Sequence, residues 1–187
     1  MEHTPDAYAA AFRQADDETA ALIAPLSHAQ FNWKPAPDKW SVAECIDHLN
    51  TLGGGYLPML EETARATEPR GTPPYRYDWR GRLFLSGTTE RVKLPVRTLK
   101  SMAPRPLPLD PADVLGTFQA NTRRFLAVIE AMRGLDLGRI RRPSPFLPRV
   151  PFLTFPVGAL LEGSATHEER HIQQARRVTQ EPSFPTA

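Results

Sequence analysis

The stretch Trp40-Ser41-Val42-Ala43-Glu44-Cys45-Ile46-Asp47-His48-Leu49 contains the clearest helix start in the chain. Ser41 and Glu44 form a capping box, in which the Ser41 side chain accepts from the backbone near Glu44 and Glu44 reaches back. Apolar residues then recur at steps of three and four, as on one face of a helix: Ile46, Leu49, Leu52, Tyr56 and Leu60. The pattern predicts a helix over residues 41–67, with a kink or thinning at Gly53-Gly54-Gly55 and Pro58 rather than an end.

Three more helices are predicted around this one, over residues 6–26, 110–133 and 157–179, each with its own apolar stripe. The helix over 110–133 begins with Asp110 as N-cap and Pro111 at the first helical position. The links between the helices are rich in proline. Four such helices with one long crossover predict an all-α four-helix bundle. The 187 residues suit a single domain over residues 1–187, although the length also permits two small ones.

The Pro-rich crossover covers residues 67–109, between the second and third helices. Connections this long are uncommon in small domains unless they are functional. We expect this one to cross an end of the bundle and to help shape a pocket, with one short helix over residues 78–85. No strand pair, internal repeat or glycine-rich phosphate loop is predicted.

Composition bounds the partners and the compartment. The formal net charge is only +2, and the arginines are scattered in short pairs, so no nucleic-acid partner is predicted. The one cysteine, Cys45, excludes an internal disulfide and favours a reducing compartment. No N-terminal stretch resembles a signal peptide, and no apolar run is long enough to span a bilayer. We therefore expect a cytoplasmic protein that does not enter a membrane.

The segment His167-Glu168-Glu169-Arg170-His171 carries the chemistry. Two imidazoles four residues apart project from the same side of a helix and can hold one divalent metal ion. The pattern also fits H-E-x-x-H, the zinc-peptidase motif, whose third ligand usually follows downstream. Only 16 residues follow His171, and their sole candidate is Glu181, beside Pro182. A peptidase is therefore the least supported function.

Upstream histidines offer a better third ligand. His3 and His28 lie in a terminus and a polar turn, where we expect them to be exposed. His48 lies one turn into its helix beside apolar positions. Alone, His48 would be interpreted as a core histidine, but the His167 and His171 pair on another helix changes that interpretation. We predict a metal site of His48, His167 and His171 that accepts zinc, nickel or iron and leaves one position open.

Several neighbouring side chains have a chemical and a structural interpretation. Glu168 is the candidate catalytic residue, as a general base; alternatively it orients a histidine or faces solvent. Glu44 is interpreted as a cap rather than as support for His48, and Cys45 as a core residue rather than a nucleophile. Arg170 could bind an anionic group, although an exposed helix arginine is the simpler interpretation. Trp33 and Trp40 are interpreted as packing in the link.

The order of these motifs resembles a known family. Phe31-x-Trp33-x-Pro35-x4-Trp40-Ser41-x2-Glu44-x3-His48-Leu49, followed by His167-x3-His171 and Gln174, is similar to the DinB-like, YfiT-like metal-binding bundles. The resemblance implies an up-down-down-up bundle, often dimeric, with one metal ion held by three histidines. Relatives include transferases and isomerases that use glutathione-like thiols, and proteins assigned as metal-dependent hydrolases.

Two classes of function follow as expectations. The first is a metal-dependent enzyme acting on a small-molecule substrate, as a hydrolase or as an S-transferase with a low-molecular-weight thiol cosubstrate, in a possible homodimer. A divalent ion (Zn, Ni or Fe) with an open position would lower the pKa of a water or a thiol there. The alternative is a non-catalytic metal-binding bundle in a stress or binding role. A concave pocket favours the enzyme, and a dry, fully coordinated site favours the alternative.

Overall fold

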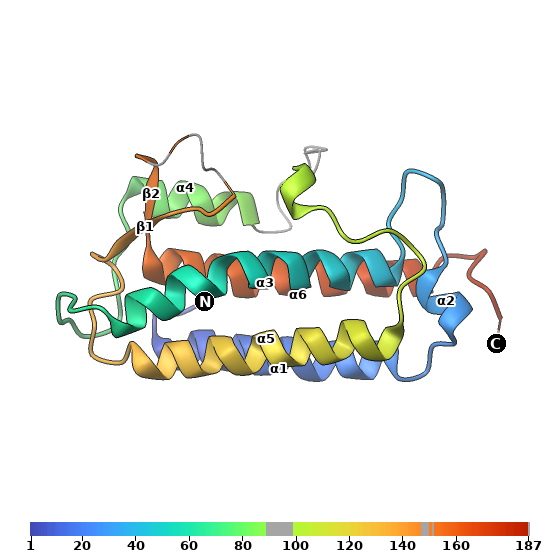
Figure 1. The fold of residues 1–187 in the computed structure, drawn as a ribbon, viewed down its shortest axis with the longest axis horizontal. Coiled ribbons are helices and arrows are strands. Elements are labelled where there is room, and N and C mark those ends of the chain that lie inside the picture. Colours follow the sequence, from blue (N-terminus) through green and yellow to red (C-terminus); the bar gives the residue numbers. More distant parts are fainter. Residues whose placement is uncertain (89–98, 147–149, 151, 187) are drawn as a thin grey trace.

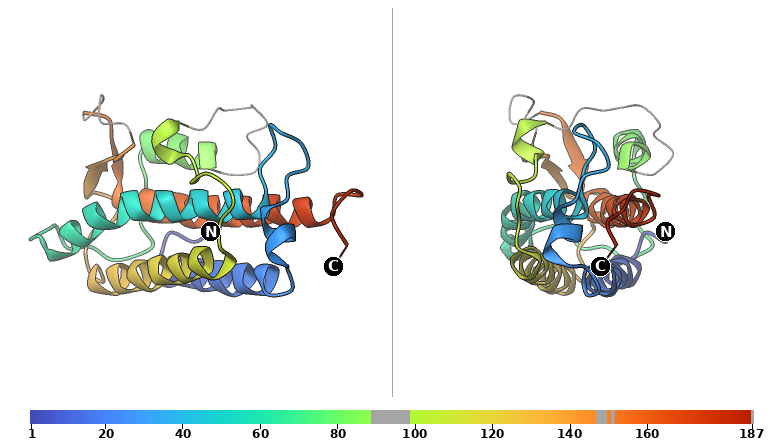
Figure 2. Two further views of the ribbon diagram at one scale, coloured as in Figure 1. Left: turned by 45° about the vertical axis from the view of Figure 1, so that its right-hand side comes forward. Right: turned by 90° about the vertical axis from the view of Figure 1, so that its right-hand side faces the viewer.

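Four long helices form the body of the protein in a computed structural model, which describes residues 1–88, 99–146, 150 and 152–186. They are α1 (Pro5–Ile23), α3 (Val42–Arg65), α5 (Pro111–Ala131) and α6 (Val157–Thr179). Figure 1 shows α3 and α6 in one layer above α5 and α1. The end-on view in Figure 2 shows the four helices grouped around a common centre. The predicted four-helix bundle is confirmed.

The helices run up, down, down and up. In Figure 1, α1 and α6 run from left to right, whereas α3 and α5 run from right to left. Because α3 and α5 are parallel, the chain must return along the bundle between them. In the described parts of that connection, α4 (Trp79–Thr88) and the short 3-10 helix η1 (Lys100–Met102) lie beside the α3–α6 layer, not across an end of the bundle. The predicted helix over 78–85 corresponds to α4, and residues 89–98 of the predicted crossover lie outside the described residues.

Local sequence signals set the helix ends. The backbone N–H of Glu44 donates to Ser41 Oγ at 3.1 Å, and that of Ser41 donates to Glu44 Oε2 at 2.9 Å, which confirms the predicted capping box. Asp110 caps α5 as predicted. The helix predicted over 6–26 is shorter, because Pro25 has no N–H with which to continue it, and α1 ends at Ile23. A separate short helix, α2 (His28–Asn32), follows with a capping box of its own.

Helix α3 continues without a break through its glycines and Pro58. Figure 1 shows it bending toward its C-terminal end, in agreement with the predicted kink. Unbroken continuation matters because the helix carries His48 near one end and wall residues of the pocket further along.

The prediction that the chain has no strand pair is wrong. β1 (Arg141–Pro143) pairs antiparallel with β2 (Thr154–Pro156), so that Arg142 lies opposite Phe155. The Arg141 guanidinium ties the two strands together by donating to Thr154 Oγ1 at 3.1 Å, and it ties the ribbon to the start of α4 by donating to Asp78 Oδ2 at 2.7 Å. Strands of three residues that end in proline are too short to show a period of two in the sequence.

The core consists of two apolar clusters at different levels of the bundle. One contains Phe12, Tyr56 and Phe125, and the other contains Ile46, Phe118 and Ile172. Along each long helix, polar side chains separate the members of the two clusters; those that are buried include Asn50, Asn121, Thr122 and Glu168. The bundle is therefore polar inside at the level where the histidines lie. None of the described helices combines the length and apolar character needed to cross a membrane.

Candidate metal centre

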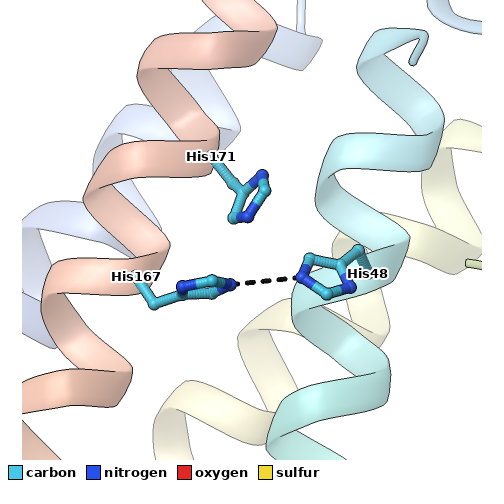
Figure 3. A group of neighbouring side chains, drawn as sticks. All are labelled: His48, His167 and His171. Carbon is cyan, nitrogen blue, oxygen red and sulfur yellow. Dashed lines mark hydrogen bonds between the residues drawn. The ribbon is translucent and has the colours of Figure 1, made fainter. Parts of the chain in front are cut away.

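Three histidines converge between α3 and α6 (Figure 3). His48 comes from α3, and His167 and His171 come from successive turns of α6. Each ring offers one nitrogen, and these nitrogens lie within 4.8 Å of one another. The Nε2 atoms of His48 and His167 are 3.1 Å apart. The antiparallel packing of the two helices thus brings together the three residues predicted from the sequence.

A backbone carbonyl selects the tautomer of His48. Its Nδ1 lies 2.5 Å from the oxygen of Met102, which can only accept, so Nδ1 carries the proton. The other nitrogen, Nε2, then presents a lone pair to the space between the three rings. This is the arrangement of metal-ligating histidines, in which the second ring nitrogen donates to a carbonyl or carboxylate.

Burial keeps all three imidazoles neutral. It is the largest cause of the lowered pKa of each ring, and the Arg170 charge adds to it. The pKa of His167 falls to about 3 and that of His171 to about 2, with further contributions from the neighbouring histidines. A neutral imidazole is the form that binds a metal ion. At neutral pH the cluster consists of ligand-competent rings rather than mutually repelling cations.

The donor set fits a divalent ion such as zinc, nickel or iron, all of which accept imidazole nitrogen. The buried Nδ1 of His171 has no hydrogen-bond partner in the described part of the chain. Buried polar atoms are usually paired, so this one indicates a group, ion or water that completes the site. The His48 Nε2 lone pair can accept from an Nε2–H of His167, 3.1 Å away, and a bound ion would take the place of this hydrogen bond.

A short strap, residues 99–105, holds the Met102 carbonyl over His48. The strap is tied to α3 by Arg105, whose guanidinium pairs with the buried carboxylate of Asp47. Asp47 directly precedes His48, so one turn of α3 carries both this candidate ligand and the anchor of the segment that orients it. The sequence analysis did not predict this pair; the one signal in the sequence was an acidic residue, Asp47, directly before the candidate ligand His48.

Trp40 also belongs to the site. Its ring centroid lies 5.0 Å from that of His48 and 5.6 Å from that of His171. The indole covers one side of the cluster, so the prediction that Trp40 only packs in the link is incomplete. Trp33 does pack there, edge to face against Phe184 at 5.5 Å.

Glu168 lies on the pocket wall and is buried, with 6% of its surface exposed. Its Oε2 has no partner among the described residues. Burial, followed by the nearby charge of Asp16, raises the pKa of this carboxyl well above its ordinary value. The alternative that Glu168 faces solvent is therefore wrong. Its role as a general base, or in orienting a histidine, stays a prediction.

The remaining histidines and the other candidate residues are not members of the three-histidine cluster. His28 is exposed as expected, but His3 is half-buried and its Nδ1 lies 2.7 Å from Glu162 Oε2, so the expectation of an exposed His3 is wrong. Glu44 caps α3 and pairs with Lys34 at 2.9 Å. Cys45 is fully buried, and burial raises the pKa of its thiol, as expected of a core residue.

The histidines line a cavity of about 990 Å³. The cavity lies between α3, α6, α4 and the strap, and it reaches inward as far as Phe125 of α5. This volume is at the upper end of the range for small-molecule sites. A metal ion held by the three histidines would therefore face a cavity and not a closed core.

Comparison with known proteins places the chain. A sequence model of the DinB superfamily matches residues 11–175. Among solved structures, YfiT from Bacillus subtilis has a TM-score of 0.64 and 13% sequence identity, over 97% of this chain and 89% of YfiT. At this identity the likeness shows the fold. No curated protein matches. The match covers most of the chain, including His48, His167 and His171, and the chain therefore belongs to the DinB superfamily.

Proposed function

We propose that this protein is a metal-dependent enzyme that acts on a small molecule, with His48, His167 and His171 as the ligands of one divalent ion. The observation that carries the proposal is the position of the three neutral imidazoles on the wall of a large cavity. A non-catalytic metal-binding bundle would be expected to have a dry, fully coordinated site. The cavity beside the histidines disfavours that alternative. YfiT is described as "a probable metal-dependent hydrolase", which favours hydrolysis as the reaction class here.

The chain's own residues would divide the work. A divalent ion held by the three rings would supply positive charge that lowers the pKa of a water or a thiol at the open position. Met102 and Trp40 fix the orientation of His48. We assign proton transfer to Glu168, because it lines the same cavity as the three histidines. Burial also raises the pKa of its carboxyl from the ordinary value of 4.5 in the direction of neutrality, where acid–base catalysis is most effective.

A thiol-dependent S-transferase is the second candidate. A cavity of about 990 Å³ has room for a small thiol beside a second substrate, whereas a hydrolase needs room for one substrate and water. The two are separated by screening low-molecular-weight thiols with electrophiles against a panel of esters and amides without thiol. A rate that requires the thiol identifies the transferase.

The first experiment is elemental analysis of untagged protein. We expect about one zinc, nickel or iron per chain in the wild type and in the His28→Ala control, because His28 is exposed and belongs neither to the cluster nor to the cavity wall. We expect His48→Ala to lose the metal. Wild type without stoichiometric metal, or His48→Ala with undiminished metal, contradicts the proposal.

Glu168→Gln tests the catalytic assignment separately. The amide has nearly the same shape but does not take up a proton in the working pH range, so we expect a 100-fold or larger loss of kcat with the metal content unchanged. Unchanged kcat would remove Glu168 from the mechanism and leave the metal site standing. The homodimer stays a prediction, and light scattering after gel filtration measures it.

A further inference from the structure

The cavity differs in character along its length. Along α6, the wall runs from Gly163 to Gln174, which is about 16 Å at 1.5 Å per residue. Near Gly163 it is apolar and aromatic, with Tyr56, Phe84 and Phe125. Phe84 lies directly over Gly163, because an added Cβ on that glycine would come within 2.4 Å of its ring. The histidines occupy the middle of the wall.

The other end of the cavity carries cationic and polar groups. Gln174 lines it from α6 one turn beyond His171, and Lys39 lines it from the link before α3. Arg170 lies between His167 and His171 on α6 and also lines the cavity. Because α3 runs antiparallel to α6, the N-terminal end of α3 meets the C-terminal half of α6, as Trp40 against His171 confirms. Lys39, directly before Trp40, therefore lies near the turn of α6 that carries Arg170 and His171.

Arg170 is available to a ligand. Six other arginines pair with carboxylates: Arg105, Arg124, Arg133, Arg141, Arg142 and Arg176. Within the described residues, Arg170 makes no such pair, although it is half-buried. Two acids also line the cavity, namely Asp38, which is exposed, and Glu168, which lies at the level of the histidines. Neither forms an ion pair with Arg170 in the described chain.

We propose that the cavity is a two-part site for an amphipathic organic anion, whose apolar body lies between Tyr56, Phe84 and Phe125 and whose carboxylate pairs with Arg170. The proposal rests on the proposed function in taking this cavity as the substrate site. The guanidinium fork suits a planar carboxylate, and Lys39 adds a second positive charge. His167 lies between Gly163 and Arg170 on α6, so the middle of the bound molecule would pass His167, where a reacting bond is needed.

A matched pair of probes tests the anion subsite. 6-Phenylhexanoate carries the anion, and 6-phenylhexanamide is its neutral counterpart. Binding is measured by calorimetry on chelator-treated protein, so that the carboxylate cannot gain affinity from a metal ion. We expect wild type to bind the anion about tenfold more tightly than the amide, the value of one charge-assisted hydrogen bond.

Four variants locate the interaction. Arg170→Gln should lose the tenfold preference while keeping the affinity for the amide, and Arg170→Lys should retain part of it. Arg13→Gln, on the exposed side of α1, should bind as wild type does. Phe84→Ala should weaken both probes equally.

The outcomes separate this proposal from the metal site. Equal binding of the two probes by wild type, an undiminished preference in Arg170→Gln, or no binding of either probe overturns the anion subsite. Metal content is measured on the same proteins. A chain that binds no metal but keeps the Arg170-dependent preference refutes the enzyme proposal and supports the anion subsite.

Discussion

Arg105 closes the strap onto the buried carboxylate of Asp47. Its Nε and Nη2 donate to Asp47 Oδ1 at 2.9 and 2.7 Å, and its backbone N–H donates to Oδ2 at 2.7 Å. Asp47 is 2% exposed, so few other groups could satisfy its charge. The pair joins the strap that carries the Met102 carbonyl to the helix that carries His48.

Removal of Arg105 should destabilise the fold. Arg105→Ala leaves a buried carboxylate with only the backbone N–H, and we expect a loss of about 2 kcal/mol in the free energy of unfolding, measured with urea. Arg124→Ala is the control, because its partner Glu61 is largely outside the core and such pairs contribute about 0.2–1 kcal/mol. Equal losses in the two variants would contradict a special role for the Asp47 pair.

The same variant should weaken metal binding without removing a ligand. Outer groups that orient a metal-ligating histidine contribute about 10- to 100-fold to affinity. Competition with a chromogenic chelator should therefore show at least tenfold weaker binding in Arg105→Ala. In the metal-free protein, ¹⁵N NMR should show a single His48 tautomer in wild type and a mixture in the variant. A metal affinity equal to wild type would show that the strap does not position His48.

Metal removal should lower thermal stability. An ion that binds only the folded chain stabilises it by about 2.7 kcal/mol at 100 times its Kd. For a chain of this size, that corresponds to a Tm increase of roughly 5–10 °C. Differential scanning calorimetry of chelator-treated protein, before and after zinc is added back, measures the effect. In His48→Ala the addition of zinc should leave Tm nearly unchanged.

The metal-free protein should lose stability as the pH falls below about 6.5. The folded-state pKa values of His167 and His171 are lowered to about 3 and about 2, whereas an unfolded histidine titrates near 6.5. Between these values the unfolded chain binds more protons, so its population grows as the pH decreases. From pH 7.5 to 5.5, each of these histidines should account for about 1.4 kcal/mol of lost stability. His171→Asn should show a correspondingly smaller loss in urea unfolding, and an identical loss would contradict the lowered pKa.

Two helix glycines should respond in opposite ways to alanine. Gly116 of α5 has nothing within 4 Å of an added Cβ, so Gly116→Ala should stabilise by about 0.5–1 kcal/mol through helix propensity. At Gly163 the added carbon would meet the Phe84 ring, and the same change should destabilise by about 1 kcal/mol or more as α4 is displaced. Urea unfolding of both variants measures the difference, and a Gly163→Ala variant as stable as Gly116→Ala would show that Phe84 does not pack there.

Much of the fold could be predicted from local signals. Two helix starts could be predicted because each depends on residues within one turn: the capping box at Ser41 and Glu44, and the start of α5 at Asp110 and Pro111. The β1–β2 ribbon was not predicted, because its strands of three residues are too short to show a period. The His3–Glu162 contact was not predicted either, because it joins residues from opposite ends of the chain.

The site divides in the same way. Two candidate ligands on α6 could be predicted from the sequence, because the helical period places His167 and His171 on one side, and His48 stood out by its apolar surroundings. The folded structure was needed to show that the three rings meet, that Met102 and Arg105 hold one of them, and that they line a cavity where Arg170 has no ion pair among the described residues. Helix geometry depends on residues within a few positions of one another, whereas the packing of α3 against α6 depends on the whole core.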